Sequence, residues 1–457
     1  MSLSVSRSAV RAPLVMLLAL VLLLGSLLVA PIPAAADGPP DPVRFATFNA
    51  SLNRVSAGLA FSDLSERYDD QEPDLELRKR RFQAATVAEI IQRVRPEVLL
   101  INEFDFEPNN ALATEFQDNY LAVSHNGSDP IVYDHVYVAP SNTGVLPIPP
   151  AGDPLLYNFD NNASFGGPND AFGFGFFPGQ FGMAVFSQHP IITDEIRTFR
   201  NFLWKDMPGA LLPDDPRTDA PADWYSSSEL GIFRLSSKSH WDVPIDIDGT
   251  TVHFLVSHPT PPVFDDPPAF PAGVDFNGRR NSDEIRLWAD YVTPGAGGYI
   301  YDDNAGFGGL KPGEKFVIAG DQNADPLDGD SFEAPDFVGA IQQLLNNPRI
   351  NTTVTPESLG APQQSALQGG INASHLGDPR FDTADFADGA PGNLRADYVL
   401  PSRNLRIVGS GVFWPLASDP LFRLVGVFNS TFLAGFPSSD HRSVWVDVVV
   451  PGSARDG

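Results

Sequence analysis

The segment SSDHRSVWVDVVV (residues 438–450) places the dipeptide Asp440-His441 directly before a run in which apolar and polar residues alternate. Such alternation is typical of a β-strand, so this acid and this imidazole are expected where a strand meets a loop. Loops at the rim of a sheet are where proteins most often build binding and catalytic sites. Other predicted strands of the chain meet polar residues in the same way.

Polar residues of similar chemistry adjoin five further apolar runs. They are Asn49 in VRFATFN (43–49), Glu103 after VLLIN (98–102), His258 after TVHFLVS (251–257), Asp321 and Asn323 in KFVIAGDQN (315–323), and Asp397 before YVLP (398–401). One strand ending of this kind means little, because polar residues are common in turns. Six in one chain form a pattern, and they predict a shared site at one rim of a sheet system.

The order of the predicted elements indicates an α/β or α+β fold. Residues 74–95 carry apolar side chains at helical spacing, and Pro96 ends that helix. A second helix is expected from Asn281 to Tyr291, with Asn281 as its N-cap and Glu284 three residues later. Because some strands alternate with helices and others are consecutive, we expect one domain, residues 41–451, built on a large mixed sheet system.

Long stretches rich in Gly, Pro, Asn and Phe interrupt these elements. They cover residues 140–181, 205–228, 261–280 and 294–312. They are too long to be plain connections, so we predict ordered surface loops that shape a cleft, or lids.

The N-terminal segment has the layout of a secretory signal peptide, residues 1–36. Arg7 and Arg11 precede an apolar run from residue 14 to 24, and alanines at 34–36 offer a cleavage site. The alternative is a retained N-terminal membrane anchor, since the apolar stretch approaches the length of a membrane span. Cleavage would give a secreted, extracellular protein, and no later segment is apolar enough to act as a transmembrane domain.

Composition excludes several kinds of chemistry. The chain has no cysteine, which rules out thiolate nucleophiles, zinc–cysteine sites and iron–sulfur clusters. It also lacks a Walker A loop, a G-x-S-x-G elbow, an HExxH motif and a Rossmann glycine fingerprint. The net charge of −27 argues against a stable nucleic-acid complex, although it does not exclude hydrolysis of nucleic acid at a metal site.

The carboxylates and the amide at the strand endings suit phosphate chemistry. Asp321 and Asn323 are two residues apart, so in extended chain they face the same way. A carboxylate can bind a metal or take a proton from water, and an amide can donate to a phosphoryl oxygen. The alternative for this pair is a simple Asx turn. Glu103 is a hard oxygen ligand of the kind that Mg²⁺ or Mn²⁺ prefers, or else a rim carboxylate that caps a neighbouring element.

The histidines are best interpreted through their partners and their strand parity. An imidazole is most useful when a carboxylate fixes its tautomer, and Asp397 or another carboxylate could hold His441. Asp440 would then be left for metal or solvent. His258 shares a face with the apolar residues of its strand and stands at the strand exit, whereas His253 lies on the other face and is expected to be structural.

Other polar residues carry weaker signals. Lys238 and His240 could reach phosphate or a leaving group, or could lie in a solvated loop. Arg279 and Arg280 could grip phosphate oxygens, although salt bridges to Asp275 and Asp283 would explain them equally well. The acidic turn formed by Asp325, Asp328 and Asp330 could hold a structural Ca²⁺, although it lacks EF-hand spacing and such turns are more often just solvated.

The series and its order resemble the endonuclease/exonuclease/phosphatase superfamily over nearly all of residues 43–450. The resemblance implies a four-layer sandwich of two packed mixed β-sheets flanked by helices, and metal-dependent phosphoester hydrolysis. It also implies a role for each residue of the series: Glu103 as the Mg²⁺ ligand with Asn49 beside it, Asp321 as the activator of water, Asn323 as a phosphoryl ligand, His441 as a stabiliser of transition-state charge, and His258 as a contact to phosphate or leaving oxygen.

The sequence therefore predicts a secreted Mg²⁺-dependent phosphoester hydrolase whose substrate is a small, lipid or nucleotide phosphate ester. The first alternative is an extracellular nuclease. An alternative of another class is a non-catalytic binding module on the same fold. A module that had lost its chemistry should have lost some of the residues that the chemistry needs, and Glu103, Asp321, Asn323 and His441 are all present.

Overall fold

The computed structural model describes residues 41–148, 157–162, 164–265, 270–332, 334 and 337–452, which lie in one compact unit of the chain. The predicted signal peptide falls outside these residues. Among the residues described, no helix combines the length and the apolar character that a membrane crossing requires.

A six-stranded mixed sheet forms one half of the core, with the strand order β12-β13-β1-β2-β4-β3. Its strands are β1 (Val43–Asn49), β2 (Val98–Asn102), β3 (His135–Tyr137), β4 (Met183–Ser187), β12 (Arg406–Val412) and β13 (Val444–Val449). β1 and β2 run parallel, and their register sets Asn49 opposite Asn102. The polar residues that follow these two strands therefore start from the same rim of the sheet.

A five-stranded sheet forms the other half, with the order β11-β8-β7-β6-β5. Its strands are β5 (Arg197–Thr198), β6 (His240–Ile247), β7 (Thr250–Ser257), β8 (Lys315–Asp321) and β11 (Asp397–Pro401); a separate two-stranded ribbon joins β9 (Ala384–Asp385) to β10 (Asn393–Leu394). β7 and β8 are parallel, and β11 runs antiparallel to β8 with Asp397 opposite Asp321. Two members of the polar series are thus cross-strand neighbours.

The two sheets pack face to face through the apolar side chains that alternate along their strands. Phe45 of β1 is fully buried, and its ring centroid lies 5.6 Å from that of Phe254 on β7. On β7, Phe254 belongs to the core between the sheets, and its neighbour Leu255 belongs to the core on the outer side of the five-stranded sheet. His253 lies away from the inter-sheet core and pairs with Asp242 at 2.8 Å, as its parity predicted.

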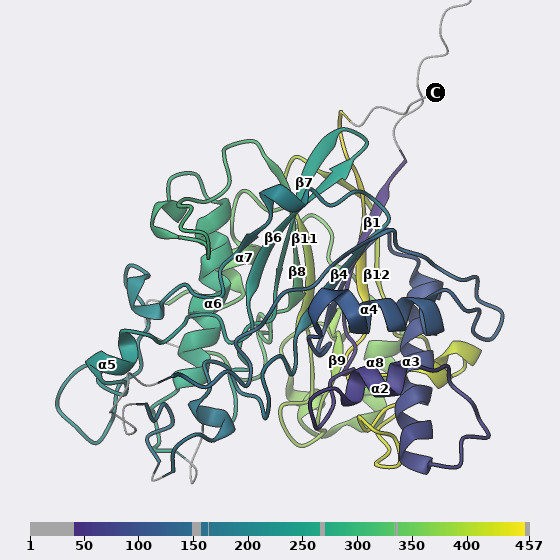
Figure 1. Cartoon of the computed structure of the whole chain (residues 1–457), viewed down its shortest axis with the longest axis horizontal. Helices are drawn as coiled ribbons and strands as arrows, with labels where there is room; N and C mark the ends of the chain where they lie inside the picture. The colour runs from purple at the N-terminus through teal and green to yellow at the C-terminus, as the bar shows by residue number, and fades with distance from the viewer. Residues whose placement is uncertain are drawn as a thin grey trace, which may run out of the picture. The chain divides into compact units, whose positions relative to one another are not determined.

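Helices cover the outer faces of both sheets, which gives the predicted sandwich (Figure 1). Helices α2 (Leu59–Leu64), α3 (Leu75–Val94) and α4 (Ala111–Phe116) flank the six-stranded sheet, and α6 (Phe276–Val292) and α7 (Gln342–Leu345) flank the other. The remaining helices are α5 (Ser227–Leu230) and α8 (Gly360–Gln368). The helix predicted at 74–95 is α3. Asp74 caps it by accepting from the backbone N–H groups of Glu76 and Leu77, and Arg95 ends it in a left-handed conformation before Pro96.

The helix predicted to begin at Asn281 begins at Phe276 instead, with Asp275 as its N-cap. Asn281 therefore lies inside α6 and does not cap it. Its side-chain amide donates to the carbonyls of Thr260 and Gln322, at 2.8 and 2.9 Å. The Asn-x-x-Glu pattern looked like a capping box, but both side chains bind neighbouring loops that sequence spacing does not reveal.

We expect Phe45→Ala to lower the free energy of unfolding by about 3–5 kcal/mol, because the variant leaves a cavity between the sheets. Urea titration followed by circular dichroism would measure the change. Phe307→Ala is the matched control, since that ring is 69% exposed and should cost little. A loss at Phe45 no larger than at Phe307 would contradict the role assigned to the inter-sheet core.

Candidate active site

Asp321 is the centre of the site. It ends β8, it is buried, and its Oδ2 accepts from Asn49 Nδ2 at 3.0 Å. The Nε2 atoms of two histidines approach the same oxygen, His258 at 3.4 Å and His441 at 3.6 Å. Three other predicted residues, contributed by both sheets and by the segment before β13, therefore converge on this one carboxylate.

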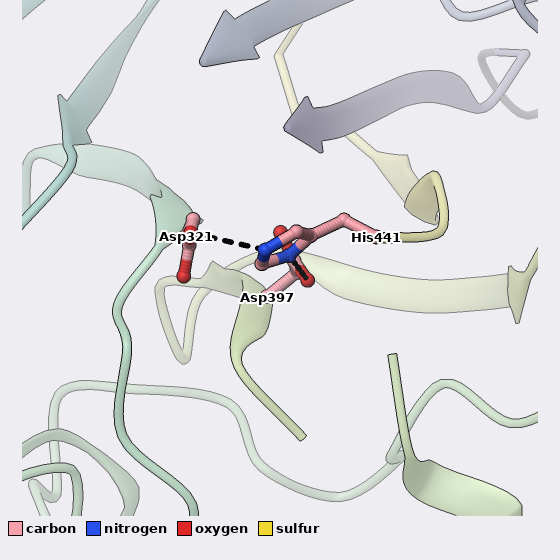
Figure 2. A group of neighbouring side chains, drawn as sticks. All are labelled: Asp321, Asp397 and His441. Atoms are coloured by element: carbon pink, nitrogen blue, oxygen red, sulfur yellow. Dashed lines mark hydrogen bonds and ion pairs between the residues drawn. The ribbon is translucent and has the colours of Figure 1, made fainter. Parts of the chain in front are cut away.

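His441 is held by Asp397 on its other side (Figure 2). Its Nδ1 lies 2.9 Å from Asp397 Oδ2, an oxygen that also accepts from the Thr383 hydroxyl. The sequence left the partner of His441 open between Asp397 and other carboxylates, and in the structure it is Asp397. Asp440 points elsewhere, as expected for adjacent residues in extended chain.

Burial and mutual contacts shift the pKa values of His441, Asp321 and Asp397. Burial opposes the charged form of His441, but the carboxylates of Asp397 and Asp321 outweigh it and raise the pKa of His441 well above its usual value. Burial would likewise raise the pKa of Asp321, yet the charge of His441 and the hydrogen bonds from His258 and Asn49 lower it. Burial raises the pKa of Asp397 to about 6 in spite of His441. At neutral pH the group therefore holds an ionised Asp321 beside an imidazolium.

The pKa of His258 shifts in the opposite direction to that of His441. Burial, together with the nearby charge of Lys238, lowers the pKa of His258 to about 4, so the ring is neutral at physiological pH. Its Nδ1 is buried and makes no hydrogen bond with the described residues. The two histidines of the site therefore differ in charge at neutral pH.

Glu103 lies on the other side of Asn49, whose Nδ2 also donates to Glu103 Oε1 at 3.1 Å. Burial and then the charge of Asp440 raise the pKa of Glu103 to about 7, so a nearby cation would be needed to favour its ionised form. Asp440 itself accepts from the Ser439 hydroxyl at 3.3 Å. The two carboxylates of Glu103 and Asp440 fit a hard divalent cation, whereas the amide oxygen of Asn49 accepts from the Ser51 backbone N–H at 3.2 Å.

A second set of possible metal ligands is the buried group Asp321, Asp397 and His441. Two of its members are already joined by the hydrogen bond between His441 and Asp397. That bond has the geometry of a carboxylate that orients an imidazole, so the oxygen-rich surroundings of Glu103 fit a metal better. The identity of the metal stays a prediction.

Asn323 follows Asp321 in a left-handed conformation, with φ of 50°. Its backbone N–H donates to Asp321 Oδ1 at 2.9 Å, and its side-chain amide donates to the Pro259 carbonyl at 3.2 Å. The Asx turn considered from the sequence is therefore present, and it fixes Asn323 beside Asp321 and the segment after His258.

Lys238 also belongs to the site. The side chain is buried, and its Nζ donates to the Pro259 carbonyl at 3.3 Å. Burial lowers the pKa of Lys238, against the nearby carboxylates of Glu284, Asp321 and Glu103. This cation lies close enough to the carboxylates of the site to complement an anionic substrate.

Two of the weaker predictions are wrong. His240 is fully buried, with its ring nitrogens 2.6 Å from the Ser236 hydroxyl and 2.9 Å from the Glu284 carbonyl, so it cannot reach phosphate. Arg280 is buried and donates to backbone carbonyls, among them that of Leu235 at 2.8 Å. The guanidinium stabilises loops instead of gripping a substrate.

The remaining predictions fall outside the site. Arg279 stacks its guanidinium over the Phe332 ring, 4.7 Å from the centroid. In the acidic turn, Asp325 accepts from the backbone N–H groups of Leu327, Asp328 and Arg395, and Asp328 accepts from those of Leu376 and Gly377. These carboxylates anchor loops, and nothing in their contacts indicates the predicted Ca²⁺.

Sequence reasoning missed two buried residues that position the site. Asn102 accepts from the backbone N–H of Asp321 at 3.2 Å and so joins the two sheets at the rim. Glu284 on α6 accepts from the backbone N–H groups of Ser237 and Thr260, both at 2.6 Å, and so holds the segments next to Lys238 and His258. Asn102 could have been found from its place beside Glu103, at the end of an apolar strand.

The chain belongs to the endonuclease/exonuclease/phosphatase family, whose model matches residues 46–441. The family comprises nucleases and phosphatases, enzymes that hydrolyse phosphoesters. The match includes every residue of the polar series from Asn49 to His441.

Three solved structures from different sources are similar to the chain. An endonuclease/exonuclease/phosphatase from Beutenbergia cavernae is 14% identical, with 91% of this chain and 73% of that chain covered and a TM-score of 0.44. A mannosyl-6-phosphatase from Bacteroides thetaiotaomicron is 11% identical, with 89% and 100% covered and a TM-score of 0.40. The human Nocturnin catalytic domain is 12% identical, with 90% and 96% covered and a TM-score of 0.38. No curated protein matches the chain in sequence.

We expect Arg280→Met to lower the free energy of unfolding by at least about 2 kcal/mol, because it leaves buried carbonyls without their charged donor. Arg279→Met is the matched control on the same helix and should cost less. Urea denaturation of both variants would measure the difference. An Arg280 variant with unchanged stability would restore the hypothesis of a substrate contact.

Proposed function

We propose that the protein is a metal-dependent phosphoester hydrolase in which water attacks phosphorus beside Asp321. The convergence of Asn49, His258 and His441 on Asp321 Oδ2 is the observation that carries the proposal. A buried carboxylate that stays ionised and is surrounded by donors is placed to orient a water molecule and to accept its proton, as the bond from water to phosphorus forms and the ester P–O bond breaks.

The two histidines and Asn323 would serve the phosphoryl group. His441, kept charged and oriented by Asp397, donates toward negative charge that develops in the transition state. His258 is neutral and carries one N–H, on the Nε2 that approaches Asp321 Oδ2 at 3.4 Å, and this N–H can donate to a phosphoryl or leaving-group oxygen in the site. Asn323 can donate from its amide without adding charge.

Glu103 would hold the divalent cation, Mg²⁺ or Mn²⁺, with Asn49 beside it and Asp440 as a further oxygen ligand. A cation bound there would polarise a phosphoryl oxygen and offset the negative charge of the substrate. Asn49 donates to both Glu103 and Asp321, so the same amide keeps the proposed metal ligand Glu103 and the proposed base Asp321 at a fixed separation.

The surface charge favours small substrates. A net charge of −27 repels extended polyanions, which supports a small, lipid or nucleotide phosphate ester over DNA or RNA. We also propose that the protein acts outside the cytoplasm, after removal of residues 1–36.

We expect the protein from Asp37 onward to hydrolyse one class of ester with Mg²⁺ and to stop in EDTA. The panel is bis-p-nitrophenyl phosphate, p-nitrophenyl phosphate, plasmid DNA, sphingomyelin and inositol hexakisphosphate. Asp321→Asn keeps the shape of the side chain but removes the base, so kcat should fall on the order of 10²-fold or more.

Asp447→Asn is the matched control for this series, because Asp447 pairs with Arg44 at the opposite end of β1 and should leave turnover unchanged. Retention of activity by Asp321→Asn would contradict the role of this carboxylate. Folded protein that is silent on the whole panel with Mg²⁺ would favour the non-catalytic binding module, and cleavage of plasmid DNA alone would favour the nuclease.

N-terminal sequencing of the protein recovered from culture medium should begin at Asp37, because the alanines at 34–36 match the preference of signal peptidases. Replacing Ala34 and Ala36 with bulky residues should block this cleavage. Intact protein that remains in the membrane fraction would instead identify residues 1–36 as an anchor.

A further inference from the structure

The loop from Gly173 to Gly182 exposes two phenylalanine rings to solvent. Phe174 is 49% exposed and Phe176 is 68% exposed, and their ring centroids lie 5.5 Å apart in an edge-to-face arrangement. Two large apolar side chains left in water on one loop need an explanation beyond packing. We refer to Phe174 and Phe176 as the aromatic ledge.

One end of this loop is joined to the segment that follows Glu103. The backbone N–H of Phe104 donates to the Gly182 carbonyl at 3.0 Å, and that of Phe106 donates to Gly179 at 2.8 Å. β4 continues from here beside β2, with Met183 opposite Asn102. This end of the loop therefore starts at the rim that carries Glu103.

The same end is also tied to the segment after β1. The buried carboxylate of Asp105 accepts from the backbone N–H groups of Arg54 and Phe181, at 2.8 and 3.2 Å. Gln180 donates from its side chain to the Arg54 carbonyl at 2.8 Å. The chain that leaves Asn49 and the chain that leaves Glu103 thus share one anchor with the loop.

The other end of the loop is joined to the segment that carries Lys238. Asn142 accepts from the backbone N–H of Gly173 and donates its own N–H to the Lys238 carbonyl, at 3.2 and 2.8 Å. A Cβ at Gly173 would lie 1.8 Å from the Ser237 carbonyl oxygen, so only glycine permits this approach. One end of the loop is therefore joined to the segment after Glu103, and the other end is joined to the segment that carries Lys238.

Tight backbone packing holds the ledge in place. The Phe176 N–H donates to Gln180 Oε1 at 2.8 Å, and a Cβ at Gly175 would meet the Gly144 nitrogen at 2.7 Å. The exposed rings are consequently presented by a fixed backbone. This geometry is that of a preformed contact surface, and it differs from that of a lid that must close.

We propose that the aromatic ledge binds an aromatic group of the phosphoester, such as a nucleobase or an aryl group, while the phosphate lies at Asp321. This inference rests on the proposed function and narrows its substrate class. Every aromatic ring offers a face that a phenylalanine can stack on or meet edge-on. A lipid surface is less favoured, because a protein of net charge −27 is repelled by the anionic lipids that strengthen membrane attachment.

The test measures binding without requiring turnover. Calorimetric titration with Mg²⁺ present would compare phenylphosphonate, cyclohexylphosphonate and methylphosphonate, three anions that the enzyme cannot hydrolyse as esters. The wild type should bind phenylphosphonate about tenfold more tightly than the other two. The variant Phe174→Leu/Phe176→Leu keeps apolar volume but should lose this preference, and Phe307→Ala, an exposed ring elsewhere, should keep it.

The outcomes separate the ledge from the proposed activity. Preference for phenylphosphonate in a protein that turns over no ester would support the ledge and contradict the hydrolase. Turnover of esters with equal binding of the three phosphonates would overturn the ledge and leave the hydrolase standing. Sedimentation with phosphatidylcholine vesicles that is lost in the leucine variant, without phenyl preference, would overturn the proposal in favour of a lipid contact.

Discussion

The face-to-face packing of the two sheets is the constraint on which the site depends. Phe45 and Phe254 meet in the core between the sheets, and this contact fixes which face of each strand turns inward. A slip of one residue would turn Asn49 or Asp321 to the opposite face. The same apolar contacts that stabilise the fold therefore decide whether donors from one sheet reach a carboxylate on the other.

The hydrogen bonds and ion pairs around Asp321 depend on this alignment of the two sheets. A buried carboxylate such as Asp321 is stable only when donors surround it, and Asn49, His258 and His441 supply them from three separate segments. Asn102 adds a fourth link by accepting from the Asp321 backbone. Because each donor is itself positioned by the sheets or by adjacent loops, the arrangement exists before any substrate arrives.

The polar series was predictable because each of its members adjoins a strand whose apolar pattern is visible in the sequence. Parity along β7 correctly separated His258 from His253, and the helix at 74–95 was visible from its spacing and from Pro96. The two packed sheets flanked by helices also agree with the prediction drawn from the family resemblance.

Contacts between distant loops were not predictable. Arg280 looked like a phosphate ligand because it is a cation in an acidic chain, but it serves carbonyls brought near it by folding. Asn281 matched a capping pattern and yet lies inside a helix. The partner of His441 was undecided for the same reason, since 44 residues separate it from Asp397 in sequence.

Asp397 and Asp321 are opposite each other on neighbouring strands, so the charge of His441 also affects the protonation of both carboxylates. The His441 ring supplies the positive charge that lets two buried carboxylates stay ionised as neighbours. Without that charge, their mutual repulsion and burial would make one of them retain a proton near neutral pH. The residue at position 441 therefore decides where the site keeps its proton, and a neutral replacement there would move that proton to a carboxylate and turn a pair of bases into an acid and a base.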